Sequence, residues 1–164
     1  MEVLWAPWRI EYILSKKEEG CIFCLEEDKS KDRERLILYR GPHSIVLMNK
    51  FPYNNGHLLI APKRHVSDIC SLNEEESKEI FFMLRNSVEI LRKVMNPDGF
   101  NIGVNLGKVA GAGIEEHLHF HVVPRWNGDT SFMTVLGEVR VIPEHIKQTY
   151  DKLLPYFQKI KKGG

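Results

Sequence analysis

Short apolar runs separated by turn-forming residues dominate the first part of the chain. Residues 36–39 (LILY) and 44–49 (SIVLMN) flank a Gly-Pro pair, and residues 57–61 (HLLIA) directly follow an Asn-Gly pair. Runs of this length that end at Gly, Pro and Asn are typical of β-strands joined by tight turns. The pattern therefore predicts three successive strands that form a meander.

Residues 73–96 instead carry the period of an amphipathic helix. Acidic residues crowd the first turn, apolar side chains recur at spacings of three and four, and Pro97 and Gly99 follow the last turn. These features predict a helix from Asn73 to Asn96. Its apolar positions are Ile80, Met83, Leu84, Val88, Leu91 and Val94. A second helix is expected from Pro143 to Phe157, because proline is favoured in a first turn.

Two more strands are predicted in the segments FNIGVNLG (100–107) and HLHFHVVP (117–124), which a glycine-rich connection joins. Strands, a long helix, more strands and a last helix indicate an α+β fold with a mostly antiparallel, five-stranded sheet. At 164 residues the chain has the length of about one domain, and no repeat or linker divides it.

Charge and composition argue against several classes of partner. The 23 Lys and Arg side chains are balanced by 22 Asp and Glu, so no overall field attracts nucleic acid or an anionic membrane. The first twenty residues lack the pattern of a signal peptide, and no apolar run approaches the ~18 residues of a membrane span. With three cysteines and no export signal, we expect the protein in the reducing cytoplasm.

Three histidines, His117, His119 and His121, occupy alternate positions in EEHLHFHVVPRW. In a strand they share one face, while the apolar residues between them point to the other. Neighbouring imidazoles repel one another when protonated, which argues against a purely structural role. They suit metal binding or the transfer of a phosphoryl or acyl group. Side chains two apart in a strand lie about 6.5–7 Å from each other, so we expect the three histidines to have different tasks.

These segments resemble a known family. HLHFHVV matches the His-φ-His-φ-His-φ-φ signature (φ, apolar) of the histidine triad (HIT) family of nucleotide hydrolases and transferases, and MNKFPYNNGHLLIAPKRH resembles the hairpin segment before its helix. The resemblance spans residues 21–126 of a single domain, with an N-terminal arm (1–20) and a C-terminal extension (127–164). It implies a HIT-like fold and a homodimer with a ten-stranded sheet, to which the apolar run Phe81–Met83 offers surface.

The resemblance also implies roles for individual residues. His119 would attack the α-phosphorus of a nucleotide and form a nucleotidyl-imidazole intermediate, while His121 would hydrogen-bond phosphate oxygens. A backbone carbonyl, which the sequence does not identify, would hold the His119 tautomer. Asn49 and Asn105 match family positions that contact the ribose or phosphate, but both also fit a simpler role in capping strands and forming turns.

The segment before the triad departs from the common family pattern. Many members carry Gly-Gln-Ser or Gly-Gln-Thr there, whereas this chain has Ala112 and Gly113 in place of the glutamine and the hydroxyl residue. In those members the two polar side chains help to bind phosphate and to protonate the leaving group. Here the resemblance implies that assistance to the leaving group comes from elsewhere, such as backbone N–H groups of residues Gly111 to Gly113 that act as a small anion nest. The departure weakens the case for a nucleoside phosphoramidate hydrolase.

Three other segments, LWAPWR, GAGI and VVPRWNGDTSFM, resemble the bacterial branch that includes diadenosine tetraphosphate phosphorylases. This resemblance implies that an adenine dinucleotide is split at its α-phosphate, by hydrolysis or, with inorganic phosphate, by phosphorolysis. The alternatives are a nucleotide-binding regulatory protein, a phosphoramidate hydrolase of the same family, and a zinc-stapled interaction module. An intact His119 favours an enzyme, because binding alone requires no nucleophile.

Cys21 and Cys24, in GCIFCLEE, have the spacing of two thiolates that share one metal ion. A redox pair has the same spacing, but it requires a strand before the motif and a helix that begins at it. The charged residues around this motif do not predict such a context. Two inert thiols are the third interpretation.

Zinc-bearing relatives complete such a site with the histidine of a Pro-Lys-x-His segment, here His65, and with the first triad histidine, here His117. The resemblance therefore implies a structural Zn²⁺ held by Cys21, Cys24, His65 and His117. His117 would then face the metal and His119 the phosphate. The third cysteine, Cys70, is expected to be a small buried apolar residue.

Overall fold

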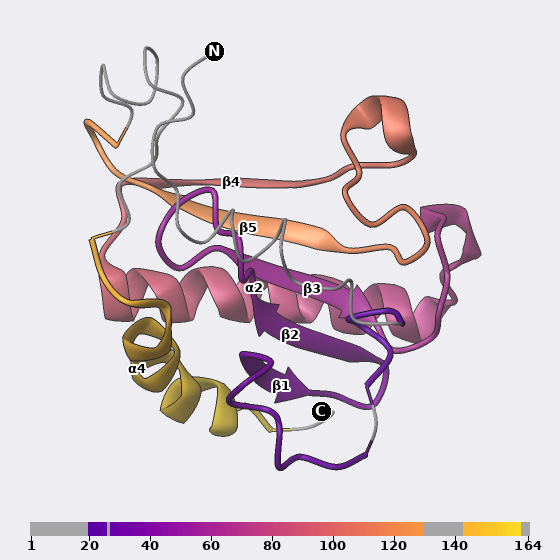
Figure 1. Cartoon of the computed structure of the whole chain (residues 1–164), viewed down its shortest axis with the longest axis horizontal. Coiled ribbons are helices and arrows are strands. Elements are labelled where there is room, and N and C mark those ends of the chain that lie inside the picture. Colours follow the sequence, from indigo (N-terminus) through magenta and orange to yellow (C-terminus); the bar gives the residue numbers. More distant parts are fainter. Residues whose placement is uncertain (1–19, 26, 130–142, 162–164) are drawn as a thin grey trace.

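A five-stranded antiparallel sheet lies at the centre of the structure (Figure 1). The computed structural model describes residues 20–25, 27–129 and 143–161. The strands are β1 (Ile37–Arg40), β2 (Ser44–Met48), β3 (Leu58–Pro62), β4 (Gly99–Val104) and β5 (Phe120–Arg125). They lie in the order β1-β2-β3-β5-β4, which confirms the predicted meander and the five-stranded sheet.

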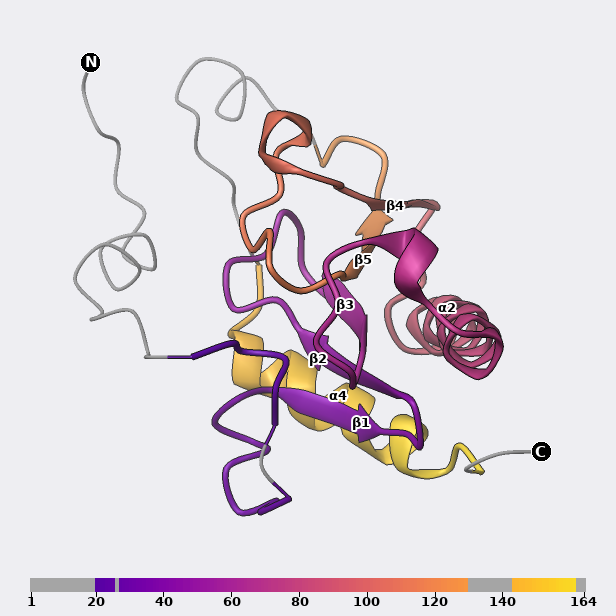
Figure 2. The same cartoon turned by 90° about the vertical axis from the view of Figure 1, so that its right-hand side faces the viewer.

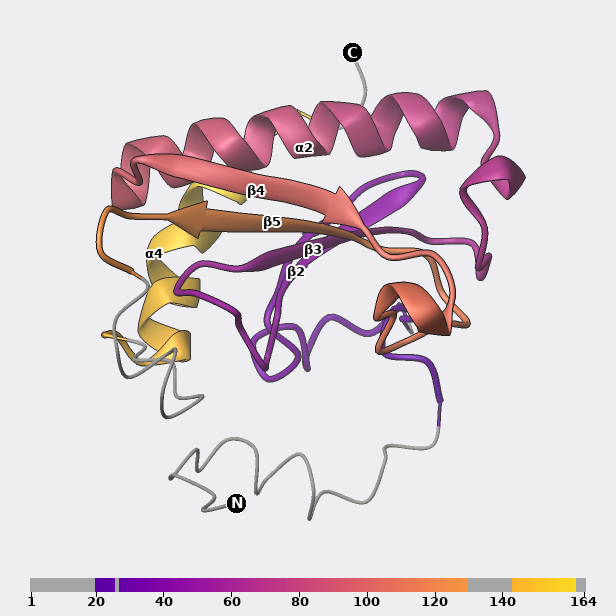
Figure 3. The same cartoon turned by 90° about the horizontal axis from the view of Figure 1, so that it is seen from above.

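Two helices pack on one face of this sheet. Helix α2 (Glu74–Met95) runs along the strands, and α4 (Ile146–Gln158) lies near β1 (Figures 2 and 3). Their buried side chains join alternate strand residues in one apolar core. This core includes Leu38, Val46, Met48, Leu58, Ile60, Val122, Ile80, Met83, Leu91, Tyr150, Leu153 and Phe157. Neither helix is both long and apolar enough to cross a membrane, and the same holds for the rest of the described residues.

The opposite face of the sheet carries a second apolar cluster, over which loops are packed. The cluster consists of Phe23, Ile37, Ile45, Leu47, Leu59 and Ala61. The loop residues Cys21, Leu25 and Ile114 pack against it. Figure 3 shows the 3-10 helix η2 (Lys108–Ala110) and the chain near residue 21 on the side away from α2. Because both faces of the sheet are buried, β1, β2 and β3 are nearly continuous apolar runs.

Helix α2 begins and ends as the sequence predicts. Asn73 accepts a hydrogen bond from the Glu76 backbone N–H, and the Glu76 carboxylate accepts one from Asn73 N, so the two form a capping box. Asn96 ends the helix in the left-handed conformation. Arg64 donates to the same Glu76 carboxylate and lowers its pKa. This ion pair anchors the residue next to His65 to the helix.

Glu79 of α2 fixes the turn between β1 and β2. Its carboxylate accepts hydrogen bonds from the backbone N–H groups of His43 and Ser44 and from the Ser44 hydroxyl. A Cβ at Gly41 would lie 1.9 Å from Glu79 Oε1, so a side chain at this position would displace the carboxylate from these contacts. The turn that the Gly-Pro pair predicts is therefore also the place where helix α2 contacts the β1–β2 hairpin.

Strand β5 is shorter than predicted. Its pairing with β3 begins at Phe120, opposite Ile60, and not at residue 117. β3 ends at Pro62, which has no N–H to offer, and the Leu118 N–H instead donates to the Val66 carbonyl at 2.7 Å. His117 and His119 consequently lie in the segment that leads into β5.

Two smaller predictions are wrong. Helix α4 begins at Ile146 rather than at Pro143, because the His145 side chain accepts a hydrogen bond from a backbone N–H of the first turn and acts as the N-cap. Cys70 is exposed rather than buried, since it lies in the 3-10 helix η1 (Ile69–Ser71), which the Asp68 side chain caps at the surface.

Candidate active site and metal site

A backbone carbonyl holds the middle histidine of the triad. His119 Nδ1 lies 2.8 Å from the His117 carbonyl oxygen, and the His119 side chain is nearly buried. A carbonyl only accepts hydrogen bonds, so Nδ1 carries a proton, and in the neutral ring Nε2 keeps its lone pair. The sequence predicted that such a carbonyl was needed but did not identify it. In this tautomer His119 Nε2 is available as a nucleophile.

A second chain of hydrogen bonds sets the tautomer of His121. The backbone N–H of Tyr53 donates to His57 Nδ1 at 3.0 Å, so the proton of the buried His57 ring lies on Nε2. This Nε2 is 2.9 Å from His121 Nδ1 and donates to it. The His121 proton is thereby left on its own Nε2, and His121 becomes a hydrogen-bond donor.

His121 stays neutral while it donates. Burial, and to a smaller extent the adjacent His119, lower its pKa to about 4. The two rings lie at 62° to each other with centroids 5.1 Å apart. The pair thus combines a lone-pair nitrogen with a nearby neutral N–H donor, which suits attack on phosphorus with stabilisation of the developing negative charge.

Four potential metal ligands converge at the other end of the triad. Cys21, Cys24, His65 and His117 place one ligand atom each within 4.8 Å of all the others. Cys21 Sγ and Cys24 Sγ lie 3.2 Å and 3.7 Å from His117 Nδ1, and Cys24 Sγ and His117 Nδ1 each lie 3.2 Å from His65 Nδ1. The structure therefore brings together the four residues predicted from sequence.

These distances fit a tetrahedral zinc ion. Bonds of roughly 2.3 Å to sulfur and 2.05 Å to nitrogen imply ligand separations of about 3.6 Å for S···N and 3.3 Å for N···N. His117 Nε2 donates to the Pro62 carbonyl at 2.8 Å, so its Nδ1 directs a lone pair at the other three donors. Burial lowers the His117 pKa, and His65 and His119 lower it further, which keeps the ring in the neutral form that a metal requires.

The other predicted nucleotide-binding residues lie in two loops beside the histidines. Asn49 Oδ1 accepts from the Phe51 N–H at 2.9 Å, and its Nδ2 lies 3.3 Å from His57 Nδ1. Asn105 Nδ2 donates to the Gly111 carbonyl at 3.5 Å. Gly111 has a φ of 88° at the end of η2, and Gly113 follows in the same connection. Contacts of these four residues with a nucleotide stay a prediction.

A cavity of about 250 Å³ adjoins His121. It lies between the partly exposed Tyr53 ring, the β4 face and the His121 ring, and the Tyr53 and His121 rings are stacked with centroids 5.8 Å apart. Asn101, Gly103 and Asn105 line its β4 side. This cavity therefore opens directly beside the neutral donor.

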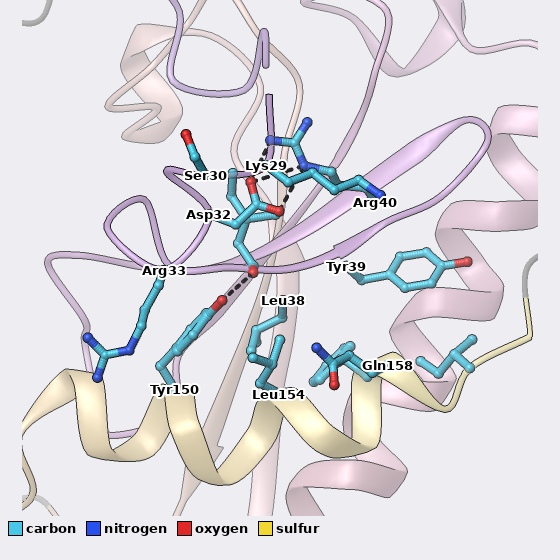
Figure 4. Close-up of a pocket in the computed structure, with 13 residues that line it drawn as sticks. Lys29, Ser30, Asp32, Arg33, Leu38, Tyr39, Arg40, Tyr150, Leu154 and Gln158 are labelled. Atoms are coloured by element: carbon cyan, nitrogen blue, oxygen red, sulfur yellow. Dashed lines mark hydrogen bonds and ion pairs between the residues drawn. The ribbon is translucent and has the colours of Figure 1, made fainter. Parts of the chain in front are cut away.

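A larger cavity, of about 480 Å³, lies between β1, α4 and residues 29–33 (Figure 4). No predicted site residue lines it. Polar groups on its wall pair with one another or with the main chain: Arg40 with Asp32, and the Tyr150 hydroxyl with the Ile37 carbonyl. The predicted site residues therefore lie at the triad and not in this larger cavity.

Two aromatic residues of the site were missed in the sequence. His57 is the first residue after the Asn-Gly turn, and the sequence predicts only its place in the hairpin. A histidine directly after a turn glycine is the local feature that could have pointed to a role in the site. Phe23 lies inside the Cys-x-x-Cys motif, and its ring stacks on that of His119. Nothing in the local pattern around Phe23 predicts that contact.

Comparison with known sequences points to one family. A family model described as HIT domain matches residues 30–128. The AP-4-A phosphorylase of Mycobacterium tuberculosis is 36% identical over 157 residues, which cover 91% of this chain and 80% of that protein. An uncharacterized HIT-like protein of Methanocaldococcus jannaschii is 32% identical over 120 residues, or 73% of this chain and 89% of that one.

Solved structures agree with the sequence comparison. A zinc-bound histidine triad family protein from Mycobacterium smegmatis superposes with a TM-score of 0.61 at 27% identity, over 76% of this chain and 84% of that chain. The Plasmodium falciparum diadenosine triphosphate hydrolase superposes with a TM-score of 0.61 over 92% of this chain and 93% of its own. At 20% identity, the second match shows a shared fold alone.

Burial predicts an unusual titration for His121, and its contact with His57 predicts a single tautomer. We expect ¹⁵N NMR to find His121 in the neutral Nε2–H form until the pH approaches 4, because burial disfavours the charged ring. The unfolded chain takes up this proton near the ordinary pKa of 6.5, so the His121 contribution to the unfolding free energy should fall as the pH drops from 6.5 towards 4. In His57→Leu, His121 should populate both neutral tautomers, whereas His43→Gln should leave it unchanged. A wild-type His121 that titrates near 6.5 would contradict this account.

Proposed function

The chain belongs to the HIT domain family, and we propose that it transfers a nucleotidyl group from a dinucleoside polyphosphate, such as diadenosine tetraphosphate, to inorganic phosphate or water. The observation that carries this proposal is the His119 ring, whose Nδ1 is bonded to the His117 carbonyl so that Nε2 is free to attack. The 36% identity to the Mycobacterium tuberculosis AP-4-A phosphorylase supports the choice of substrate.

The reaction proceeds in two displacements on the α-phosphorus. In the first, the His119 Nε2 lone pair forms a P–N bond, the P–O bond to the remaining polyphosphate breaks, and the leaving nucleotide keeps the electron pair. The His119 ring becomes cationic, and its Nδ1–H bond to the His117 carbonyl stabilises that charge. In the second, an oxygen of phosphate or water attacks phosphorus, the P–N bond breaks, and the acceptor's proton passes to solvent.

His121 and the backbone handle negative charge in this scheme. The neutral Nε2–H of His121 donates to an oxygen of the phosphorus that is attacked, as its fixed tautomer allows. The N–H groups of Gly111 to Gly113 bind further phosphate oxygens. Asn49 and Asn105 orient the ribose or the phosphate.

The residues at 112 and 113 favour this substrate over a phosphoramidate. An amine leaving group needs a proton, which a Gln and a hydroxyl residue before the triad would help to supply. This chain has Ala112 and Gly113 there. A departing polyphosphate is a far weaker base than an amine, since even a phosphate monoester has a second pKa of only about 6, so it leaves without a donated proton. Phosphoramidate hydrolysis is therefore the second candidate, and nucleotide binding without turnover is the third.

A structural zinc ion is part of the proposal. Cys21, Cys24, His65 and His117 would hold it, and the zinc-bound Mycobacterium smegmatis structure supports the assignment. With four protein ligands the site is closed, so the ion supplies folding energy and cross-links residues distant in sequence. Thiolate ligands also fit the cytoplasm as the place where the protein works.

We further propose that two chains form a homodimer with a ten-stranded sheet. β4 is an edge strand, and its Ile102 is half exposed. On α2, Met83 is buried in the core, but the adjacent Phe81 and Phe82 are 66% and 41% exposed. Large exposed apolar side chains beside an unpaired edge favour pairing with a second copy.

Turnover of diadenosine tetraphosphate with and without phosphate tests the reaction. ATP and ADP that appear only with phosphate identify a phosphorylase, whereas ATP and AMP without phosphate identify a hydrolase. His119→Ala should lower kcat by orders of magnitude while nucleotide still binds, because the chemistry needs the imidazole. Retention of more than about a tenth of kcat would exclude covalent catalysis at this residue.

Metal analysis tests the zinc site. The purified protein should contain about one zinc per chain, and Cys24→Ser should lower both the zinc content and the melting temperature, because the binding free energy of the ion contributes to folding. His119→Ala is the control and should keep its zinc and its stability. Full zinc retention in Cys24→Ser, or zinc loss in His119→Ala, would refute this division of the triad.

Sedimentation tests the dimer. The protein should sediment as a dimer at micromolar concentration, and Phe81→Glu should shift it towards monomer, because a charge in an apolar contact costs desolvation energy. Val109→Glu is a matched control, since Val109 is a fully exposed apolar residue on η2. A stable wild-type monomer would rule the dimer out.

A further inference from the structure

Phe23 connects the four candidate zinc ligands, called the metal cluster below, to His119, the proposed nucleophile. It lies between Cys21 and Cys24, in a loop closed by the hydrogen bond from Cys24 N to the Cys21 carbonyl at 3.2 Å. Its side chain is only 1% exposed. The Phe23 ring is stacked on His119, with centroids 4.9 Å apart and planes at 27°, and it also lies 5.1 Å from the His117 ring.

Two contacts thus restrain the His119 ring, and each restricts a different motion. The hydrogen bond from Nδ1 to the His117 carbonyl opposes a flip that would exchange Nδ1 and Nε2. The face of Phe23 opposes a tilt of the ring out of its plane. The carbonyl belongs to His117, a candidate zinc ligand, and the ring belongs to Phe23, in the loop between two others. If these ligands were no longer held together, the His119 ring would be free to flip and to tilt.

We propose that Phe23 is a positioning residue for His119, and that the Cys21–Cys24 loop holds the nucleophile in its attacking orientation when the metal is bound. This inference rests on the proposed function, because it assumes that His119 Nε2 attacks phosphorus. It adds a second task to a site that is otherwise structural. Zinc loss then lowers the activity of molecules that remain folded, and not only the folded fraction.

The size of the effect follows from the geometry of attack. An in-line displacement needs the nitrogen lone pair directed at phosphorus, and a misplacement of about 1 Å can lower a rate by roughly a hundredfold. Phe23 is buried and faces the ring plane of His119, so its loss should alter the orientation of the nucleophile more than the affinity for substrate.

The first test separates kcat from KM. Phe23→Leu keeps an apolar side chain but removes the flat face, and it should lower kcat about tenfold or more with KM nearly unchanged and zinc content intact. Ile45→Val is the matched control: Ile45 is equally buried in the same apolar cluster but lies on β2, and its kcat should equal that of the wild type. If Phe23→Leu loses zinc or fails to fold, Phe23→Met, whose longer and more flexible side chain adapts to the space left by the ring, is measured in the same way.

The second test needs no substrate. ¹⁵N NMR of the histidine rings at one pH should show His119 as a single Nδ1–H form in the wild type, and a broadened or mixed signal in Phe23→Leu. The same change should appear when zinc is removed from the wild type with a chelator, and it should reverse when zinc is added. This measurement does not depend on turnover of diadenosine tetraphosphate. Failure of the proposed function is therefore distinguishable from failure of this inference.

Three results would overturn the inference. One is an unchanged kcat and an unchanged His119 signal in a zinc-loaded Phe23 variant. Another is an effect on KM alone, which would make Phe23 a substrate contact. The third is a His119 signal that stays the same in the folded, zinc-free wild type. A lower kcat at constant KM together with an altered His119 signal supports it.

Discussion

The hydrogen bond between His119 Nδ1 and the His117 carbonyl is the contact on which the rest of the site depends. It decides which nitrogen of the neutral His119 ring carries the proton, and hence which nitrogen offers a lone pair in the proposed reaction. It also links the two halves of the triad, because the residue that offers this carbonyl directs its own ring at the metal cluster. His117 thus has two separate partners, because its ring faces the candidate metal ligands while its carbonyl accepts a hydrogen bond from His119. This arrangement allows alternate histidines in one short segment to have different tasks.

His121 is held neutral, and burial is the main reason. A protonated His121 would be a stronger donor but would repel a protonated neighbour and lose solvation, so its pKa lies near 4. In the proposed reaction the fixed tautomer compensates for the lack of charge, because an N–H donor that is already in place needs no rearrangement. The loops over this face of the sheet supply the burial, whereas the helices cover the other face.

Much of the fold was predictable because it depends on local patterns. Apolar runs marked β1, β2 and β3, and the period of three and four with an Asn at each end marked α2. The four candidate ligands were also predictable, since their spacings match a known family, and they converge in space. The start of β5 was not predictable, because it depends on where its neighbour β3 ends at Pro62. The roles of His57 and Phe23 depend on contacts with residues 64 and 96 positions away, which no local pattern contains.

The main chain sets both proton positions in this site, and this has a consequence for how the protein tolerates change. The Tyr53 N–H orients the His57–His121 pair, and the His117 carbonyl orients His119. Most side-chain replacements at 53 leave that donor where it is, and proline is the exception because it has no N–H. Insertion or deletion of one residue between Met48 and His57 would move the donor itself. In the hairpin that precedes β3, length is therefore a stricter requirement than composition.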